Sequence, residues 1–227
     1  DDFYTSQDRR LRNRTCKMYS RIARRAKVVC TVSEYSKQQI MKYYFVPEQR
    51  IQVIYSGADH IRDILEDRGI FEKYPQLQKG KFFFTLGSLS VRKNLKWILN
   101  HAKLFPNEYF VISGATLSSV IPPELENIRS LNNILCMGYL SDGEVKALMK
   151  DCRAFIFPSF FEGFGLPPLE ALACGTPAIV STATCLPEIY EDCVYYIDPN
   201  NPSIDLNSLI TSIVSNITPF LVAFSKA

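Results

Sequence analysis

The sequence predicts an α/β fold in which helices cover a doubly wound parallel sheet. From residue 82 onwards, short apolar runs alternate with segments of helical periodicity. Glycines and charged residues gather in the turns after the apolar runs, which is where such sheets bind ligands. Hydrophobic residues make up 47% of the 227 residues, enough for a core of this kind.

Few helices and strands are predicted before residue 81. An arginine- and lysine-rich helix is expected over 9–27, with an apolar stripe at Leu11, Tyr19, Ile22, Ala23 and Ala26. A strand over 28–32, a helix over 34–44 capped by Ser33, and a strand over 51–55 should follow. Residues 61–80 read as helix and loop without a chemical signal.

The elements after residue 81 are expected to alternate regularly. Strands are predicted at 82–86, 109–113, 134–136, 154–157, 178–181 and 194–197. Helices are predicted at 95–104, 124–131 and 142–149, within 162–177, and from 205 into the apolar last residues.

Residues 162–177, with the sequence EGFGLPPLEALACGTP, form the most informative stretch. Gly163 and Gly165 allow backbone shapes denied to other residues, and Pro167 and Pro168 suit a helix start. A strand, a glycine-bearing loop and a helix N-terminus in this order favour binding of an anion.

The same stretch resembles the E-x7-E signature of glycosyltransferase family 4, whose members are retaining, nucleotide-sugar-dependent enzymes with the GT-B fold. Glu162 and Glu170 are separated by seven residues, as in that signature. The resemblance covers about 20–200 and is strongest over 133–199.

The resemblance implies roles for the residues of this stretch. Glu162 would face the donor sugar as a catalytic residue, and Glu170 would accept hydrogen bonds from the ribose hydroxyls. The backbone N–H groups of Phe164, Gly165 and Leu166 would meet sugar hydroxyls and the distal phosphate.

The turn at 87–94, GSLSVRKN, places two adjacent cations just before a helix, which suits a diphosphate. It resembles one of the family's forms of this turn, G-[ST]-L-x-x-R-K-N. The resemblance implies catalytic roles for Arg92 and Lys93, with Gly87 and Ser88 at the donor.

A second turn, Gly138 to Ser141, resembles the family's base-binding turn, so Tyr139 and Leu140 are expected at the donor nucleotide. Thr184 to Glu188 resembles a family segment whose glutamate is more often structural than catalytic. Of the two histidines, His101 is expected at the surface.

The resemblance also implies a division of the chain into two domains and a linker. Residues 1–57 correspond to the C-terminal part, a remnant, of an N-terminal Rossmann domain that holds the acceptor. Residues 58–80 are expected to be an interdomain linker, and residues 81–227 a Rossmann-like domain that binds the nucleotide-sugar donor.

The function expected is retaining, metal-independent transfer of a hexosyl-type sugar from a GDP-, UDP- or dTDP-sugar to a glycan or lipid-linked acceptor. A diphosphate leaves without a general acid, so the cations and the helix N-terminus would stabilise its charge without a metal or another cofactor. Two interpretations outside this class stay open: a truncated or regulatory nucleotide-sugar-binding module without turnover and, less favoured, a nucleotide-sugar epimerase.

Composition limits the binding partners and the cellular location that the sequence suggests. A net charge of +3 does not indicate nucleic-acid binding, and the seven cysteines lack zinc or disulfide spacing, which favours reduced thiols in the cytoplasm. No secretory signal or apolar span is recognisable. For the basic helix, a solvated face and peripheral contact with the inner face of a membrane both stay open.

Overall fold

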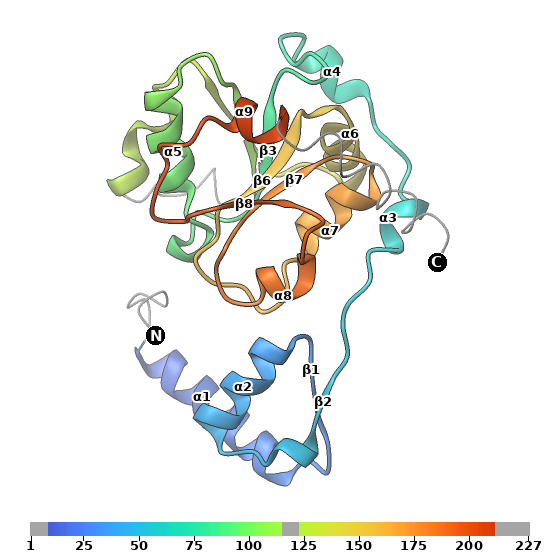
Figure 1. Cartoon of the computed structure of the whole chain (residues 1–227), viewed down its shortest axis with the longest axis vertical. Coiled ribbons are helices and arrows are strands. Elements are labelled where there is room, and N and C mark those ends of the chain that lie inside the picture. The colour runs from blue at the N-terminus through green and yellow to red at the C-terminus, as the bar shows by residue number, and fades with distance from the viewer. Residues whose placement is uncertain (1–8, 115–122, 212–227) are drawn as a thin grey trace.

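The computed structural model describes residues 9–114 and 123–211, which form a small N-terminal unit and a larger unit around the main sheet (Figure 1). The N-terminal unit has a parallel pair of strands, β1 (Val29–Thr31) and β2 (Ile51–Val53). The main sheet has six parallel strands in the order β5-β4-β3-β6-β7-β8.

The N-terminal unit packs α1 (Arg9–Arg25) and α2 (Glu34–Tyr44) near the strand pair, and η1 (Glu48–Arg50) leads into β2. Its small core contains Ala23, Val46 and Ile51. Ser33 caps α2, since its hydroxyl accepts a hydrogen bond from the N–H of Ser36 at 3.1 Å.

An extended segment leaves β2 and reaches the linker helices α3 (His60–Asp63) and α4 (Gly69–Lys73) beside the main sheet (Figure 1). Ile61 and Ile70 are buried. Lys146 fixes α3 by donating to the carbonyls of Ile61 and Ile64, each at 2.7 Å. The linker therefore lies against the larger unit instead of hanging free.

The larger unit alternates strands and helices. Its strands are β3 (Phe83–Leu86), β4 (Phe110–Ser113), β5 (Ile134–Gly138), β6 (Ala154–Phe157), β7 (Ala178–Ser181) and β8 (Tyr195–Ile197). Its helices are η2 (Val91–Lys93), α5 (Leu95–Leu104), η4 (Pro123–Arg129), α6 (Asp142–Asp151), α7 (Leu166–Ala173), α8 (Leu186–Tyr190) and α9 (Leu206–Thr211).

Both faces of the sheet are buried, as the continuous apolar strands require. On one face Phe83 and Ile156 join the core formed with α5, η4 and α9. On the other face Phe84 and Phe155 join the core formed with α4, α6, α7 and α8.

The strand order reverses between β3 and β6. The chain first builds outwards from β3 through β4 to β5, and then returns to pair β6 with the other edge of β3. The connections after β3 and β6 therefore run to opposite sides of the sheet, which opens a crevice at their carboxyl ends. The predicted cationic turn and the stretch from Glu162 follow these two strands.

The structure confirms the predicted fold class and, within two or three residues at their ends, the strands and most of the helices. The segment at 123–129 is a 3-10 helix, and α8 was not anticipated. In the predicted apolar stripe of α1, Tyr19 and Ile22 are exposed, whereas Ala23 is buried. The last residues, 212–227, lie outside the described residues.

The expectation that His101 lies at the surface is wrong, because its side chain is completely buried. Its Nε2 lies 2.5 Å from a carboxylate oxygen of Glu108, and its Nδ1 lies 2.7 Å from the carbonyl of Pro202. The ring also stacks between Trp97 and Phe105. These partners satisfy its polar atoms and make burial possible.

One carboxylate joins the two units. Glu188 of α8 accepts hydrogen bonds from the N–H of Glu34 at 2.7 Å and of Tyr35 at 2.9 Å, at the start of α2. The hydroxyl of Tyr55 donates to the same carboxylate at 3.1 Å. A carboxylate at a helix N-terminus satisfies free N–H groups and complements the helix dipole.

Among the described residues, no helix is long and apolar enough to cross a lipid bilayer.

Replacing Glu188 by Ala should expose the first N–H groups of α2. We expect hydrogen exchange at the amides of Glu34 and Tyr35 to become about two- to thirtyfold faster, because a capping acceptor contributes about 0.5–2 kcal/mol. Nuclear magnetic resonance would measure it, with Asp192→Ala as the control. Unchanged protection of both amides would contradict the contact.

Candidate functional site

Three charged side chains meet at the crevice between β3 and β6. The guanidinium of Arg92 donates from one nitrogen to both oxygens of Glu162, at 3.0 and 2.9 Å. The ammonium of Lys93 donates to Glu162 at 2.7 Å. We call Arg92, Lys93 and Glu162 the cation cluster. It carries more positive than negative charge, so it can still attract an anion.

Lys93 is the more buried cation of the cluster, with 12% of its side chain exposed against 33% for Arg92. Its ammonium also lies over the ring of Phe157, 4.5 Å from the centroid. Burial lowers the pKa of Lys93, and the charge of Glu162 opposes that shift. Glu162 therefore favours the charged form of a desolvated ammonium.

The loop from Glu162 to Gly165 has all its carbonyl groups engaged. The thiol of Cys185 lies 3.3 Å from the carbonyl of Glu162 and 3.5 Å from that of Phe164. The hydroxyl of Tyr190 donates to the carbonyl of Gly165. The carbonyl of Gly163 accepts from two serines of the N-terminal unit, Ser33 at 2.7 Å and Ser36 at 3.2 Å.

With its carbonyls held, this loop leaves donor groups available. No hydrogen bond within residues 9–114 and 123–211 uses the N–H of Phe164, Gly165 or Leu166. These groups lie at the start of α7, where the helix dipole favours a negative partner. Gly165 has a φ of 96°, and a Cβ there would lie 2.8 Å from Leu186. This geometry requires glycine.

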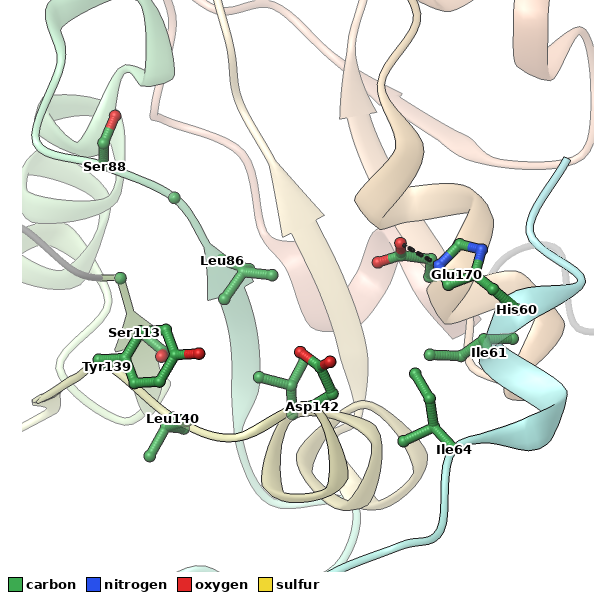
Figure 2. A pocket seen from close by; sticks show the side chains of 13 residues that line it. His60, Ile61, Ile64, Leu86, Ser88, Ser113, Tyr139, Leu140, Asp142 and Glu170 are labelled. Atoms are coloured by element: carbon green, nitrogen blue, oxygen red, sulfur yellow. Dashed lines mark hydrogen bonds and ion pairs between the residues drawn. The ribbon is translucent and has the colours of Figure 1, made fainter. Parts of the chain in front are cut away.

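A cavity of about 470 Å³ opens at the carboxyl ends of β3, β4 and β5 (Figure 2). The strand ends and α6 supply most of its lining: Leu86, Gly87, Ser88, Ser113, Gly114, Tyr139, Leu140, Asp142 and Val145. Glu170 of α7 lies at one side, and His60, Ile61 and Ile64 of the linker complete the wall.

Backbone hydrogen bonds hold the three strand ends together. The N–H of Gly87 donates to the carbonyl of Ser113 at 2.9 Å, and the N–H of Gly114 donates to that of Gly138 at 2.8 Å. A Cβ at Gly114 would lie 1.9 Å from the carbonyl oxygen of Gly87, so this position admits only glycine. The floor of the cavity is therefore rigid backbone.

The cavity and the cation cluster adjoin at Gly87. This residue lines the cavity, and a Cβ added to it would lie 3.4 Å from the side chain of Lys93. A ligand with an apolar or aromatic part in the cavity and an anionic part at the cluster would therefore span both.

The structure brings most of the predicted site residues together. The predicted residues that line the cavity are Gly87, Ser88, Tyr139, Leu140 and Glu170. The predicted residues that form the cation cluster are Arg92, Lys93 and Glu162. Phe164, Gly165 and Leu166 lie outside the cavity lining.

Sequence reasoning missed three features of the site. Gly114 could have been noticed as a glycine directly after a strand. The linker residues and the contact of Ser33 with Gly163 could not have been noticed, because they depend on contacts between distant parts of the chain.

Among the described residues, no three His, Cys, Asp or Glu side chains are grouped to hold a metal ion.

A doubly wound sheet with cations and a helix N-terminus at its switch point defines a class of phosphate-binding proteins. Comparison with known families specifies the class. The family model for glycosyl transferases group 1 matches residues 58–221, and the model for glycosyltransferase family 4 matches residues 2–62. The chain belongs to this glycosyltransferase family.

Its curated relatives include bacterial mannosyltransferases. The O-antigen chain mannosyltransferase B of Escherichia coli is 32% identical over 186 residues, covering 78% of this chain and 49% of the relative. The O-antigen chain mannosyltransferase RfbU of Salmonella typhimurium is 27% identical, covering 78% of this chain and 48% of the relative. The chain thus spans about half the length of these relatives.

Solved structures support the same fold. Anabaena Alr3699/HepE, determined in complex with UDP-glucose, superimposes with a TM-score of 0.73 at 20% identity, covering 89% of this chain and 58% of that chain. Sucrose-phosphate synthase from Thermosynechococcus elongatus gives a TM-score of 0.71 at 18% identity, with coverages of 94% and 56%. The predicted GT-B fold is thereby confirmed.

Replacing Glu162 by Gln should lower the pKa of Lys93 further. The substitution removes the charge that favours the ammonium form and leaves the burial that disfavours it, so Lys93 should lose its proton at lower pH than in the wild type. A nuclear magnetic resonance pH titration with ¹³C-labelled lysine would measure the pKa of Lys93, with Glu66→Gln as the control. A pKa that stays constant or rises would contradict the electrostatic account.

Proposed function

We propose that the chain holds the donor site of a retaining, metal-independent glycosyltransferase that moves a hexosyl sugar from a nucleoside diphosphate to a glycan or lipid-linked acceptor. In this proposal residues 81–227 bind the donor, residues 58–80 are the linker, and residues 1–57 belong to the acceptor domain. The observation that carries it is the cation cluster adjoining a cavity at the switch point of the sheet.

The geometry suits departure of a diphosphate. The base would lie beside Tyr139 and Leu140, the ribose at Glu170, and the diphosphate at Arg92 and Lys93. When the bond to the sugar breaks, negative charge grows on the diphosphate, and fixed cations stabilise it without a proton donor.

The loop before α7 would hold the sugar itself. The N–H groups of Phe164, Gly165 and Leu166 can donate to sugar hydroxyls or the distal phosphate, because the loop carbonyls are held elsewhere. Glu162 would turn from the two cations towards the sugar as the diphosphate takes its place. The cluster therefore exchanges one anionic partner for another when the donor binds.

The sugar we propose is mannose, because relatives that cover more than three quarters of this chain are named mannosyltransferases. The proposed acceptor is a growing surface polysaccharide, as the words "O-antigen chain" in those names suggest.

We place the reaction in the cytoplasm at the inner face of the membrane. Exposed Met18, Tyr19 and Ile22 lie on α1 among arginines and lysines, a combination that suits an anionic lipid surface.

Titration calorimetry of this chain with GDP, UDP and dTDP tests the donor site. We expect one of them to bind in the presence of a chelator, and Lys93→Ala to weaken binding at least about tenfold, because a hydrogen bond to a charged group contributes about 1.5–3 kcal/mol. Glu170→Ala should weaken it to a similar degree.

Lys96→Ala is the matched control, since Lys96 is exposed on α5 only three residues further on. It should bind as the wild type does. Equal affinities for Lys93→Ala and the wild type, or binding only with magnesium present, would contradict the proposal.

A further inference from the structure

The linker supplies a wall of the cavity. His60, Ile61 and Ile64 lie on the side of the cavity opposite Ser88 and Tyr139 (Figure 2). His60 and Ile61 lie in α3 and Ile64 directly follows it, outside the main sheet, at the point where the chain arrives from the N-terminal unit. The linker thus adds one histidine and two isoleucines to a site otherwise built from the strand ends, α6 and α7.

His60 contacts the carboxylate that faces the cavity. Its Nε2 lies 2.9 Å from Oε1 of Glu170 (Figure 2). The other oxygen, Oε2, has no hydrogen bond among residues 9–114 and 123–211, and the Glu170 side chain is 16% exposed. The pair therefore presents one held and one available carboxylate oxygen to a ligand.

The backbone that carries His60 is held in place, while 53% of its side chain is exposed. The next residue, Ile61, is 4% exposed, and its carbonyl accepts from Lys146 at 2.7 Å. The carbonyl of Ile64 accepts from the same ammonium at 2.7 Å, so one cation binds the C-terminal end of α3. An imidazole on a fixed backbone can orient a carboxylate with little loss of entropy.

We propose that His60 is a specificity-determining residue of the donor site, which fixes the Glu170 carboxylate so that it selects nucleotides with an intact ribose diol. The proposal rests on the proposed function, in which Glu170 meets the ribose. Two vicinal hydroxyls can donate to the two oxygens of a carboxylate only when its plane is set correctly. His60 sets that plane by holding Oε1.

The proposal narrows the class of donor. GDP and UDP carry both ribose hydroxyls, whereas dTDP lacks the 2′-hydroxyl and would lose one of the two hydrogen bonds to the Glu170 carboxylate. The loss of a hydrogen bond to a charged acceptor lowers affinity. The substrates are therefore ribonucleoside diphosphate sugars.

The test compares dissociation constants for a ribonucleoside diphosphate and its 2′,3′-dideoxy form. GDP and UDP would both be used as probes, on the full chain. The wild type should prefer the ribose form about tenfold or more, since hydrogen bonds to a charged acceptor are lost in the dideoxy form. His60→Ala should reduce this preference to about threefold or less, with little change in affinity for the dideoxy form.

His60→Gln should retain most of the preference, because the amide nitrogen of Gln can replace the imidazole donor. Leu65→Ala is the control, since Leu65 is 89% exposed on the same linker and outside the cavity. Equal preference in His60→Ala and the wild type would overturn the proposal. If His60→Ala kept the wild-type preference while Lys93→Ala still weakened binding, the proposed function would stand and only this proposal would fail. If the wild type bound neither nucleotide but bound dTDP, this proposal alone would fail; if it bound none of the three, both proposals would fail.

Discussion

The carboxylate of Glu162 holds two cations from the turn after β3, and this ion cluster joins the two halves of the sheet where the strand order reverses. Without the carboxylate, a buried ammonium and a guanidinium would repel one another at an apolar strand end. With it, both cations have a counter-ion beside the cavity at Gly87. Because the cluster keeps an excess of positive charge, we propose that a diphosphate takes over the role of Glu162 as counter-ion when the donor binds.

The loop that carries Glu162 depends on the rest of the molecule for its shape. Cys185 and Tyr190 of the larger unit bind three of its carbonyls, and Ser33 and Ser36 of the N-terminal unit bind the fourth. Burial raises the pKa of Cys185 to about 11, so the thiol keeps the proton that it donates. Together with the hydrogen bonds of Glu188, these bonds connect the start of α2 to the loop, so the shape of the loop depends on where α2 lies.

Local patterns predicted the sheet, most helices and the Ser33 cap, because each depends on residues close in sequence. The same patterns failed at His101, whose burial depends on Glu108 and Pro202. Most of the predicted site residues gather in the cavity and the cation cluster, since the family resemblance had already identified the turns that the topology brings together, but Phe164, Gly165 and Leu166 belong to neither. The sequence assigns His60 no role in the site, because its contact with Glu170 spans 110 residues.

A crystal structure of this chain with the nucleoside diphosphate that binds most tightly would test the central claim most directly. The account predicts diphosphate oxygens within about 3 Å of Lys93 Nζ and the Arg92 guanidinium. The base should lie beside Tyr139 and Leu140. A nucleotide bound elsewhere, with Lys93 and Arg92 still paired to Glu162, would contradict the assignment of the cation cluster as the diphosphate site.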